Sequence, residues 1–84
     1  MSVRIELDVP ESAFSALRAT PRQFARELRL AAAVKWYEAE MVSQAKAAEI
    51  AGVSRSEFID ALVRYGVPVM QTTPEELEAE VARG

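Results

Sequence analysis

The sequence predicts a mainly α-helical protein with one N-terminal β-strand. Residues 3–9 alternate apolar and charged side chains and stop at Pro10, a pattern typical of a half-buried strand. After Pro10, apolar residues recur with helical spacing, and Ser, Thr and Pro stand where helices begin. With 84 residues the chain can build one small hydrophobic core, so we expect one compact domain.

The predicted strand at residues 3–9 has no second strand in the chain beside it. An unpaired strand leaves backbone N–H and C=O groups without partners, so we expect it to pair with the same strand of a second copy. The apolar side chains expected to support this pairing are Val3, Ile5, Leu7 and Val9. The sequence therefore predicts a homodimer formed through the N-terminal strand.

Two helices are expected between Pro10 and residue 40. In the short segment after Pro10, Phe14 and Leu17 share one helical face. A longer helix should run from Pro21 to about Glu40, because Thr20-Pro21-Arg22-Gln23 has the spacing of a capping box. Its side chains expected to be buried to varying degrees are Phe24, Leu28, Ala31, Ala32, the Lys35 stem and Trp36. Met41 and Met70 are interpreted as gap fillers of the core.

Residues 43–66 carry the pattern of a helix-turn-helix. Helices are expected over residues 44–51 and 55–65, and a serine precedes each of them. The small Ala48 allows close helix approach, Gly52 allows a positive φ in the turn, and Val53 is an apolar plug. Gly66 is placed to end the second helix in a left-handed conformation. A plain helical hairpin used for packing is the alternative.

The amino-acid composition excludes several classes of function. The chain has no Cys and no His, which removes thiolate nucleophiles, imidazole catalysis and Cys/His zinc sites. We therefore expect neither an enzyme nor a cofactor. No stretch approaches the ~20 apolar residues of a membrane span, and no secretory signal is seen, so a cytoplasmic protein is expected. The net charge of −3 means that any contact with nucleic acid must use a local basic face.

In a helix-turn-helix, the N-terminal turn of the second helix enters the major groove of DNA. Arg55 is the expected reader of a guanine edge, because Arg can bind guanine in a bidentate manner. The complete set of expected DNA contacts is Lys46, Ser54, Arg55, Ser56, Ile59 and Arg64, with Lys46 and Arg64 at phosphates. We expect Glu57 to bond the helix cap and Asp60 to pair with Arg64. For each charged residue the alternative is a solvated helix face.

The sequence resembles a family of small prokaryotic proteins, originally uncharacterised, that are regarded as probable antitoxins and are often encoded beside a PIN-domain ribonuclease toxin. The resemblance is carried by residues 30–38, 43–58, 65–69 and 75–77 and covers nearly the whole chain. One departure is Gln44-Ala45, where relatives more often have Leu-Gly. The resemblance implies a DNA-binding antitoxin that represses its own operon and neutralises a partner toxin.

The C-terminal residues 70–84 fit a segment that binds this toxin. Thr73-Pro74-Glu75-Glu76 has capping-box spacing and opens a short acidic helix. Leu77 and Val81, four residues apart, could enter an apolar groove on the toxin, and Arg83 could approach an acidic nuclease site. A solvated acidic helix is the alternative interpretation of the same residues.

Residues 3–40 resemble a ribbon-helix-helix arrangement, in which two chains pair their strands into an antiparallel ribbon. The exposed ribbon face would carry Arg4, Glu6 and Asp8, which suits DNA poorly because two of the three are acidic. We therefore assign residues 1–40 to dimerisation, 41–69 to the helix-turn-helix and 70–84 to the toxin-binding tail. Two alternatives stay open: a dimeric helix-turn-helix regulator without a toxin, and a protein-interaction module that binds no DNA.

Overall fold

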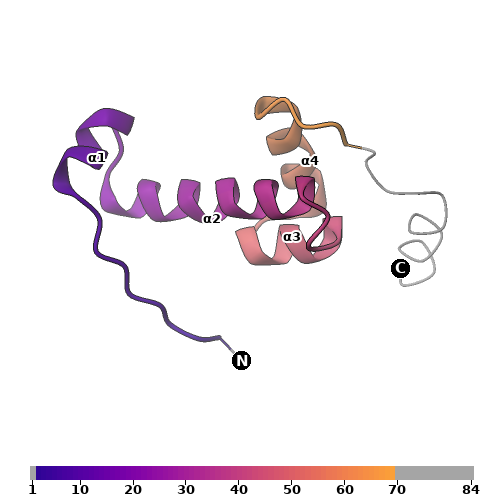
Figure 1. The fold of residues 1–84 in the computed structure, drawn as a ribbon, viewed down its shortest axis with the longest axis horizontal. Coiled ribbons are helices and arrows are strands. Elements are labelled where there is room, and N and C mark those ends of the chain that lie inside the picture. Colours follow the sequence, from indigo (N-terminus) through magenta and orange to yellow (C-terminus); the bar gives the residue numbers. More distant parts are fainter. Residues whose placement is uncertain (1, 70–84) are drawn as a thin grey trace.

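In the computed structural model, which describes residues 2–69, four helices follow one another without a strand. They are α1 (Glu11–Leu17), α2 (Pro21–Glu38), α3 (Gln44–Ala51) and α4 (Arg55–Arg64). The long helix α2 crosses the molecule, with α1 at its N-terminal end and α3 and α4 at its C-terminal end (Figure 1). Among these helices, α1 lies against α2 alone, whereas α2, α3 and α4 pack against one another.

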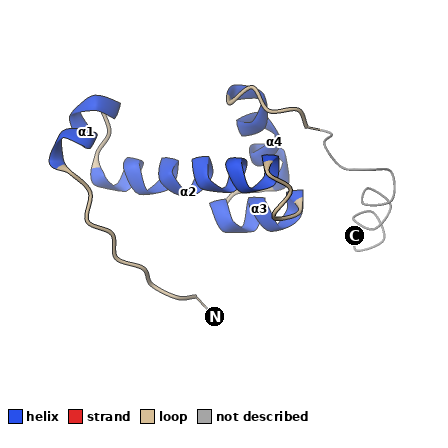
Figure 2. Cartoon of the chain, viewed as in Figure 1, coloured by secondary structure: helices blue, strands red, loops and turns tan. Residues whose placement is uncertain are grey.

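The predicted N-terminal strand is wrong. Residues 2–10 have no regular structure (Figure 2), and the expected ribbon-helix-helix arrangement is absent from the described part of the chain. The side chains of Val3, Ile5 and Leu7 are exposed, while Val9 is half-buried. The alternating pattern determines which side chains share a face, but a strand also needs a neighbouring strand to bond, and residues 2–69 supply none.

The predicted helix starts that lie within residues 2–69 are confirmed. The hydroxyl of Thr20 accepts a hydrogen bond from the Gln23 backbone N–H at 3.2 Å, and the Gln23 side chain accepts one from the Thr20 N–H at 2.9 Å. Pro21 occupies the first helical position, where it forfeits no hydrogen bond. The helix α2 ends at Glu38, two residues before the expected Glu40, which has a positive φ of 61°.

The hydrophobic core lies at the C-terminal end of α2. We call residues 30–69 the helical core and residues 2–29 the N-terminal arm. The buried apolar side chains all belong to the helical core: Ala33, Val34, Tyr37, Ala47, Ala48, Ala51, Phe58, Ala61, Leu62 and Val67. Three alanines of α3 let its backbone approach α2 and α4 closely, so one large ring, Phe58, fills the space between the helices. Ala47, Ala48 and Ala51 of α3 and Phe58, Ala61 and Leu62 of α4 thus form the apolar seam between these two helices.

The expected burial along α2 is partly wrong. Trp36 is 41% exposed and Leu28 is also exposed, whereas Tyr37 is 3% exposed. Met41, which follows α2, is exposed as well, so it does not fill a gap in the core. Adjacent residues of a helix point about 100° apart, so only one of the two aromatic rings can face the core. Tyr37 can be buried because its hydroxyl donates a hydrogen bond of 2.6 Å to the Val69 carbonyl.

The turn between α3 and α4 follows the prediction. Gly52 has a φ of +74° and ends α3 in the left-handed conformation, and Gly66 does the same after α4 with a φ of +70°. A Cβ atom at Gly52 would lie 3.0 Å from the Arg29 guanidinium, so glycine is favoured there by space as well. Ala48 is buried and Val53 packs against the core. The expected C-terminal helix and Met70 lie outside the described residues.

Candidate nucleic-acid interface

Both helices of the motif begin at a serine cap. The Ser43 hydroxyl accepts from the Lys46 N–H, and the Ser54 hydroxyl accepts from the Glu57 N–H, each at 3.1 Å. The Glu57 carboxylate completes a capping box by accepting from the Ser54 N–H at 3.1 Å. This backbone bond, with help from the Ser54 hydroxyl, lowers the pKa of Glu57 below its ordinary value. The expected role of Glu57 is confirmed, and the first turn of α4 is held in place.

One face of α4 is turned away from the core. Phe58, Ala61 and Leu62 face inward, so the residues between them point outward. Of the residues expected to contact DNA, Ser56 is exposed and Ile59 is half-buried. Val63 is 69% exposed on the same face, one turn after Ile59, and was not predicted. Val63 is four residues after Ile59, and this spacing in the sequence already indicated that the two side chains share one face of the helix.

Arg55 begins this face. Its Nη2 atom donates a hydrogen bond of 2.6 Å to Oε1 of Gln44, the first residue of α3. Gln44 carries no charge, so the guanidinium keeps its full positive charge at the start of α4. The sequence placed Arg55 at this position, but its bond to Gln44 could not be foreseen because the two side chains meet only when α4 folds back across α3.

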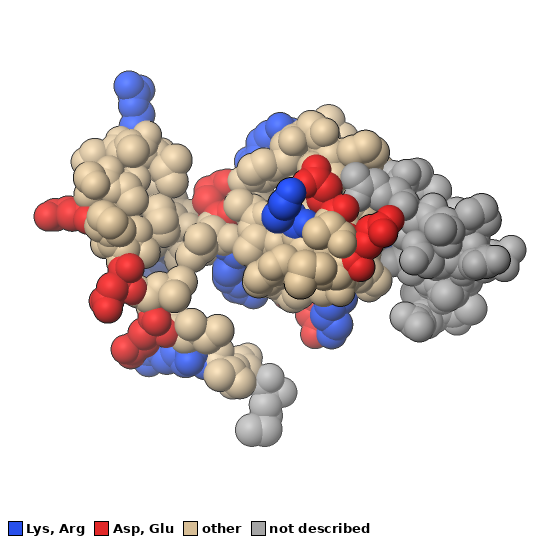
Figure 3. Space-filling view, viewed as in Figure 1, with Lys and Arg blue, Asp and Glu red and all other residues tan. Residues whose placement is uncertain are grey.

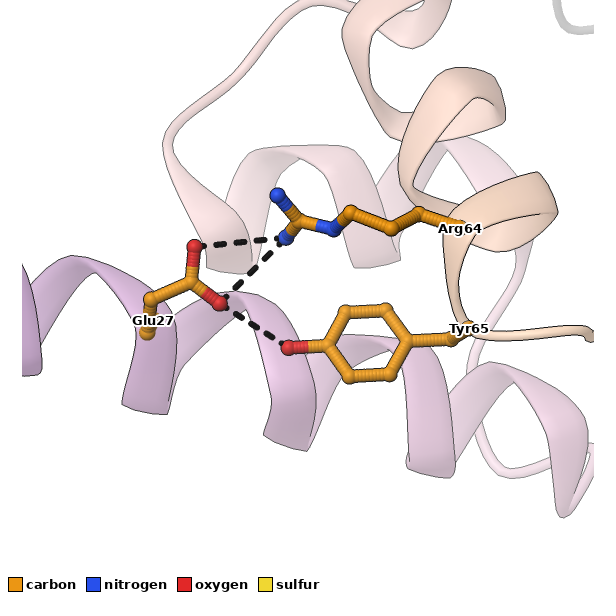
Figure 4. A network of polar contacts seen from close by, with 3 residues as sticks. All are labelled: Glu27, Arg64 and Tyr65. Carbon is orange, nitrogen blue, oxygen red and sulfur yellow. Dashed lines mark hydrogen bonds and ion pairs between the residues drawn. The ribbon is translucent and has the colours of Figure 1, made fainter. Parts of the chain in front are cut away.

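Arg64 ends α4 in a different environment. Its Nη2 atom contacts both carboxylate oxygens of Glu27 on α2, at 3.2 and 3.3 Å (Figure 4). Tyr65 donates to the same carboxylate at 3.0 Å, and the guanidinium lies 5.2 Å from the centre of the Tyr65 ring. Burial, followed by the bond to Glu27, raises the pKa of the Tyr65 hydroxyl. The expected pair with Asp60 is therefore wrong, and Arg64 ties α4 to α2.

Lys46 lies on the exposed surface of α3. Its ammonium group is 2.9 Å from the Glu49 carboxylate, and both side chains are largely exposed. An exposed pair of this kind contributes little to stability, so the ammonium group can exchange Glu49 for a phosphate at small cost. Lys46 and Arg64 are thus similarly exposed, but the Lys46 pair lies within α3, whereas the Arg64 pair joins α4 to α2.

Three arginines that were not predicted lie beside the turn. Arg18, Arg26 and Arg29 line a shallow groove with Gly52 and Glu57. Within it, Nε of Arg29 donates to the Ile50 carbonyl at 3.0 Å. The spacing of Arg22, Arg26 and Arg29 on the predicted long helix was a signal for a shared face. On the face shown in Figure 3, acidic and basic side chains are interspersed, so the cations of that face form no continuous basic patch.

Other classes of site have little support in residues 2–69. No group of three or more acidic side chains is placed to hold a metal ion there. None of the helices in this part of the chain has both the length and the hydropathy needed to cross a membrane. The residues expected to bind a toxin, Leu77, Val81 and Arg83, lie outside the described residues.

Comparison with known proteins identifies the family. A family described as uncharacterised, UPF0175, matches residues 1–83. The chain is also 35% identical over 80 residues to a UPF0175 protein of Aeropyrum pernix. These aligned residues cover 95% of this chain and 84% of that protein. No solved structure matches the chain significantly. The chain therefore belongs to the UPF0175 family.

Proposed function

We propose that the chain is a helix-turn-helix DNA-binding protein that acts as an antitoxin and represses its own operon. The observation that carries the DNA-binding part is the construction of α4. Its first turn is capped by Ser54, its inner face is anchored by Phe58, and Arg55 and Ser56 are exposed at its start. A capped helix with exposed polar residues in its first turn is suited to contact base edges in the major groove.

Charge limits how the protein binds DNA. The net charge is −3, and Asp60 lies exposed near the outward face of α4. Non-specific affinity comes mainly from neutralised phosphates, so one acidic chain gains little from this term. We expect two copies on one operator, each placing α4 in one half-site, and an affinity that depends strongly on the base sequence. Lys46 and the arginines beside the turn supply the phosphate contacts.

The antitoxin part of the proposal rests on the family resemblance of the sequence. In this part, residues 70–84 bind a PIN-domain ribonuclease through Leu77, Val81 and Arg83. Co-expression with a PIN-domain ribonuclease encoded beside the gene tests it. We expect the full chain to restore growth and a chain ending at residue 71 to fail. Growth inhibition that persists with the full chain would contradict the antitoxin role.

The DNA-binding part is tested by selecting duplexes from a randomised pool with the full chain. We expect an enriched sequence, and Arg55→Ala should weaken binding to it by about 1–3 kcal/mol, because a bidentate contact to guanine is lost. Fluorescence anisotropy at fixed salt measures both affinities. Lys35→Ala is the matched control, since it also removes one cation but from an exposed pair with Glu38 on α2. Equal affinity for selected and random duplexes would contradict sequence-specific binding.

A further inference from the structure

The first residues of α3 and α4 are joined by a side-chain hydrogen bond. Oε1 of Gln44 accepts from Nη2 of Arg55 at 2.6 Å. Gln44 is buried, with 6% of its surface exposed, whereas Arg55 is exposed. The bond lies at the end of α4 that enters the groove in a helix-turn-helix. A buried acceptor therefore holds an exposed guanidinium at the position where base reading is expected.

Contacts on the other side of Gln44 determine which way its amide points. Its Nε2 atom lies 3.5 Å from the Tyr37 hydroxyl oxygen and 3.4 Å from the Val69 carbonyl oxygen. Both atoms act as acceptors, because the Tyr37 proton is donated to the Val69 carbonyl. A reversed amide would place Oε1 against these oxygens and its N–H groups against the guanidinium. The orientation with Oε1 toward Arg55 matches donors to acceptors at these three contacts.

The helical core anchors this network. Tyr37 belongs to α2, is 3% exposed, and meets the Phe58 ring edge-on with the ring centres 5.9 Å apart. Its hydroxyl bond to Val69 also ties the segment after α4 to α2. Gln44 is thus held by groups that are themselves fixed by packing, so its acceptor oxygen stays in place as Arg55 exchanges water for DNA.

The acceptor that bonds Arg55 is the neutral amide of Gln44, and this neutrality affects the binding of DNA. A carboxylate would neutralise Arg55, as Glu27 does for Arg64 at the other end of α4. The Gln44 amide orders the guanidinium without cancelling its charge. The bond uses one N–H of Nη2, and the remaining N–H groups can donate side by side to O6 and N7 of guanine. Ordering a flexible side chain before binding lowers the entropy lost on binding.

We propose that Gln44 is a positioning residue that determines sequence specificity, because it orients the Arg55 guanidinium toward a guanine. This inference rests on the proposed DNA-binding function and adds the residue that makes the contact selective. Gln44 acts through Arg55 and needs no contact of its own with a base.

The test uses the full chain and the duplex that it selects from a randomised pool. The guanine read by Arg55 is the base whose replacement costs affinity in the wild type but not in Arg55→Ala. Discrimination is the ratio of affinities for the selected duplex and for the duplex with that guanine replaced. We expect discrimination of about tenfold or more in the wild type. In Gln44→Met, which keeps the length but removes the acceptor, it should fall severalfold, and in the Arg55→Ala background Gln44→Met should change nothing further.

Other results would overturn the inference. Tighter binding of Gln44→Met to both duplexes would mean that Gln44 sequesters Arg55. An equal loss on both duplexes that persists in the Arg55→Ala background would mean that Gln44 acts only on the fold or on a phosphate. A wild-type chain that selects no duplex would instead contradict the proposed function itself.

Two further variants keep the test valid if Gln44→Met folds poorly. Gln44→Glu keeps the size and the acceptor but adds a negative charge, so binding to both duplexes should weaken as Arg55 is neutralised. Tyr37→Phe keeps the buried ring and removes one anchor of the amide, so discrimination should fall less than in Gln44→Met. Circular dichroism of each variant checks its helix content. Unchanged discrimination in Tyr37→Phe together with unchanged affinity in Gln44→Glu would also overturn the inference.

Discussion

The N-terminal arm and the helical core use their apolar residues differently. In the helical core, Phe58 and Leu62 are completely buried between three helices. In the arm, Phe14 meets Phe24 with the ring centres 4.9 Å apart, but both rings are only half-buried, and Leu17 is 63% exposed. The arm contains large apolar side chains as well, so their presence alone does not ensure burial. The difference shows that burial requires elements that meet from several sides, and within residues 2–69 the helix α1 packs against α2 alone.

The largest expected effect comes from truncating the central ring of the core. Phe58→Ala should lower the free energy of unfolding by about 3–5 kcal/mol, because it leaves a cavity between three helices. Phe14→Ala in the arm should cost less than about 2 kcal/mol, since its ring is only partly removed from water. Denaturant unfolding followed by circular dichroism measures both. Similar losses for the two variants would show that arm and core form one cooperative unit, which would break the comparison.

A smaller effect is expected at the helix caps. Ser54→Ala removes the cap of α4 within the core and should lower the free energy of unfolding by about 1 kcal/mol. Thr20→Ala removes the same kind of cap from α2 within the arm. Because Pro21, Arg22 and Gln23 in the first turn of α2 are exposed, that loss should appear as faster amide hydrogen exchange in this turn, with little change in the unfolding midpoint. Equal shifts of the two midpoints would contradict a loosely attached arm.

The smallest expected effect is a pH dependence at the α4 cap. The Ser54 N–H bond lowers the pKa of Glu57 from its ordinary value of 4.5, so its stabilising contribution is present above about pH 4.5. That contribution is lost as the pH falls through the lowered pKa. Glu57→Gln keeps an acceptor oxygen but does not titrate. The stability advantage of the wild type over Glu57→Gln should therefore shrink between about pH 6 and about pH 3. A difference that is constant over this range would rule out the linkage.

Much of the helical core can be predicted from local patterns. At the starts of α2, α3 and α4, the hydroxyl of Thr20, Ser43 or Ser54 accepts a hydrogen bond from the backbone N–H three residues later. The turn depends on the positive φ of Gly52. These interactions span few residues, so the sequence contains both partners of each at a fixed separation.

The candidate site is predictable only in part. The position of Arg55 in the first turn of α4 follows from the cap, but its partner Gln44 does not. Arg64 was expected to bond its helix neighbour Asp60, yet it bonds Glu27, which is 37 residues away in sequence. Long side chains choose among all acceptors within reach, and helix packing decides which acceptors those are.

The sequence by itself determined where the helices begin and turn, because caps and positive-φ glycines act between residues that are close in the chain. The tertiary structure alone decided that Tyr37 rather than Trp36 enters the core, since that choice depends on which side of α2 meets α3 and α4. It also decided that residues 3–9 form no strand, because an alternating pattern cannot supply a neighbouring strand to bond. Arg55 and Arg64 look alike in the sequence, and only packing gives one a neutral partner and the other a carboxylate.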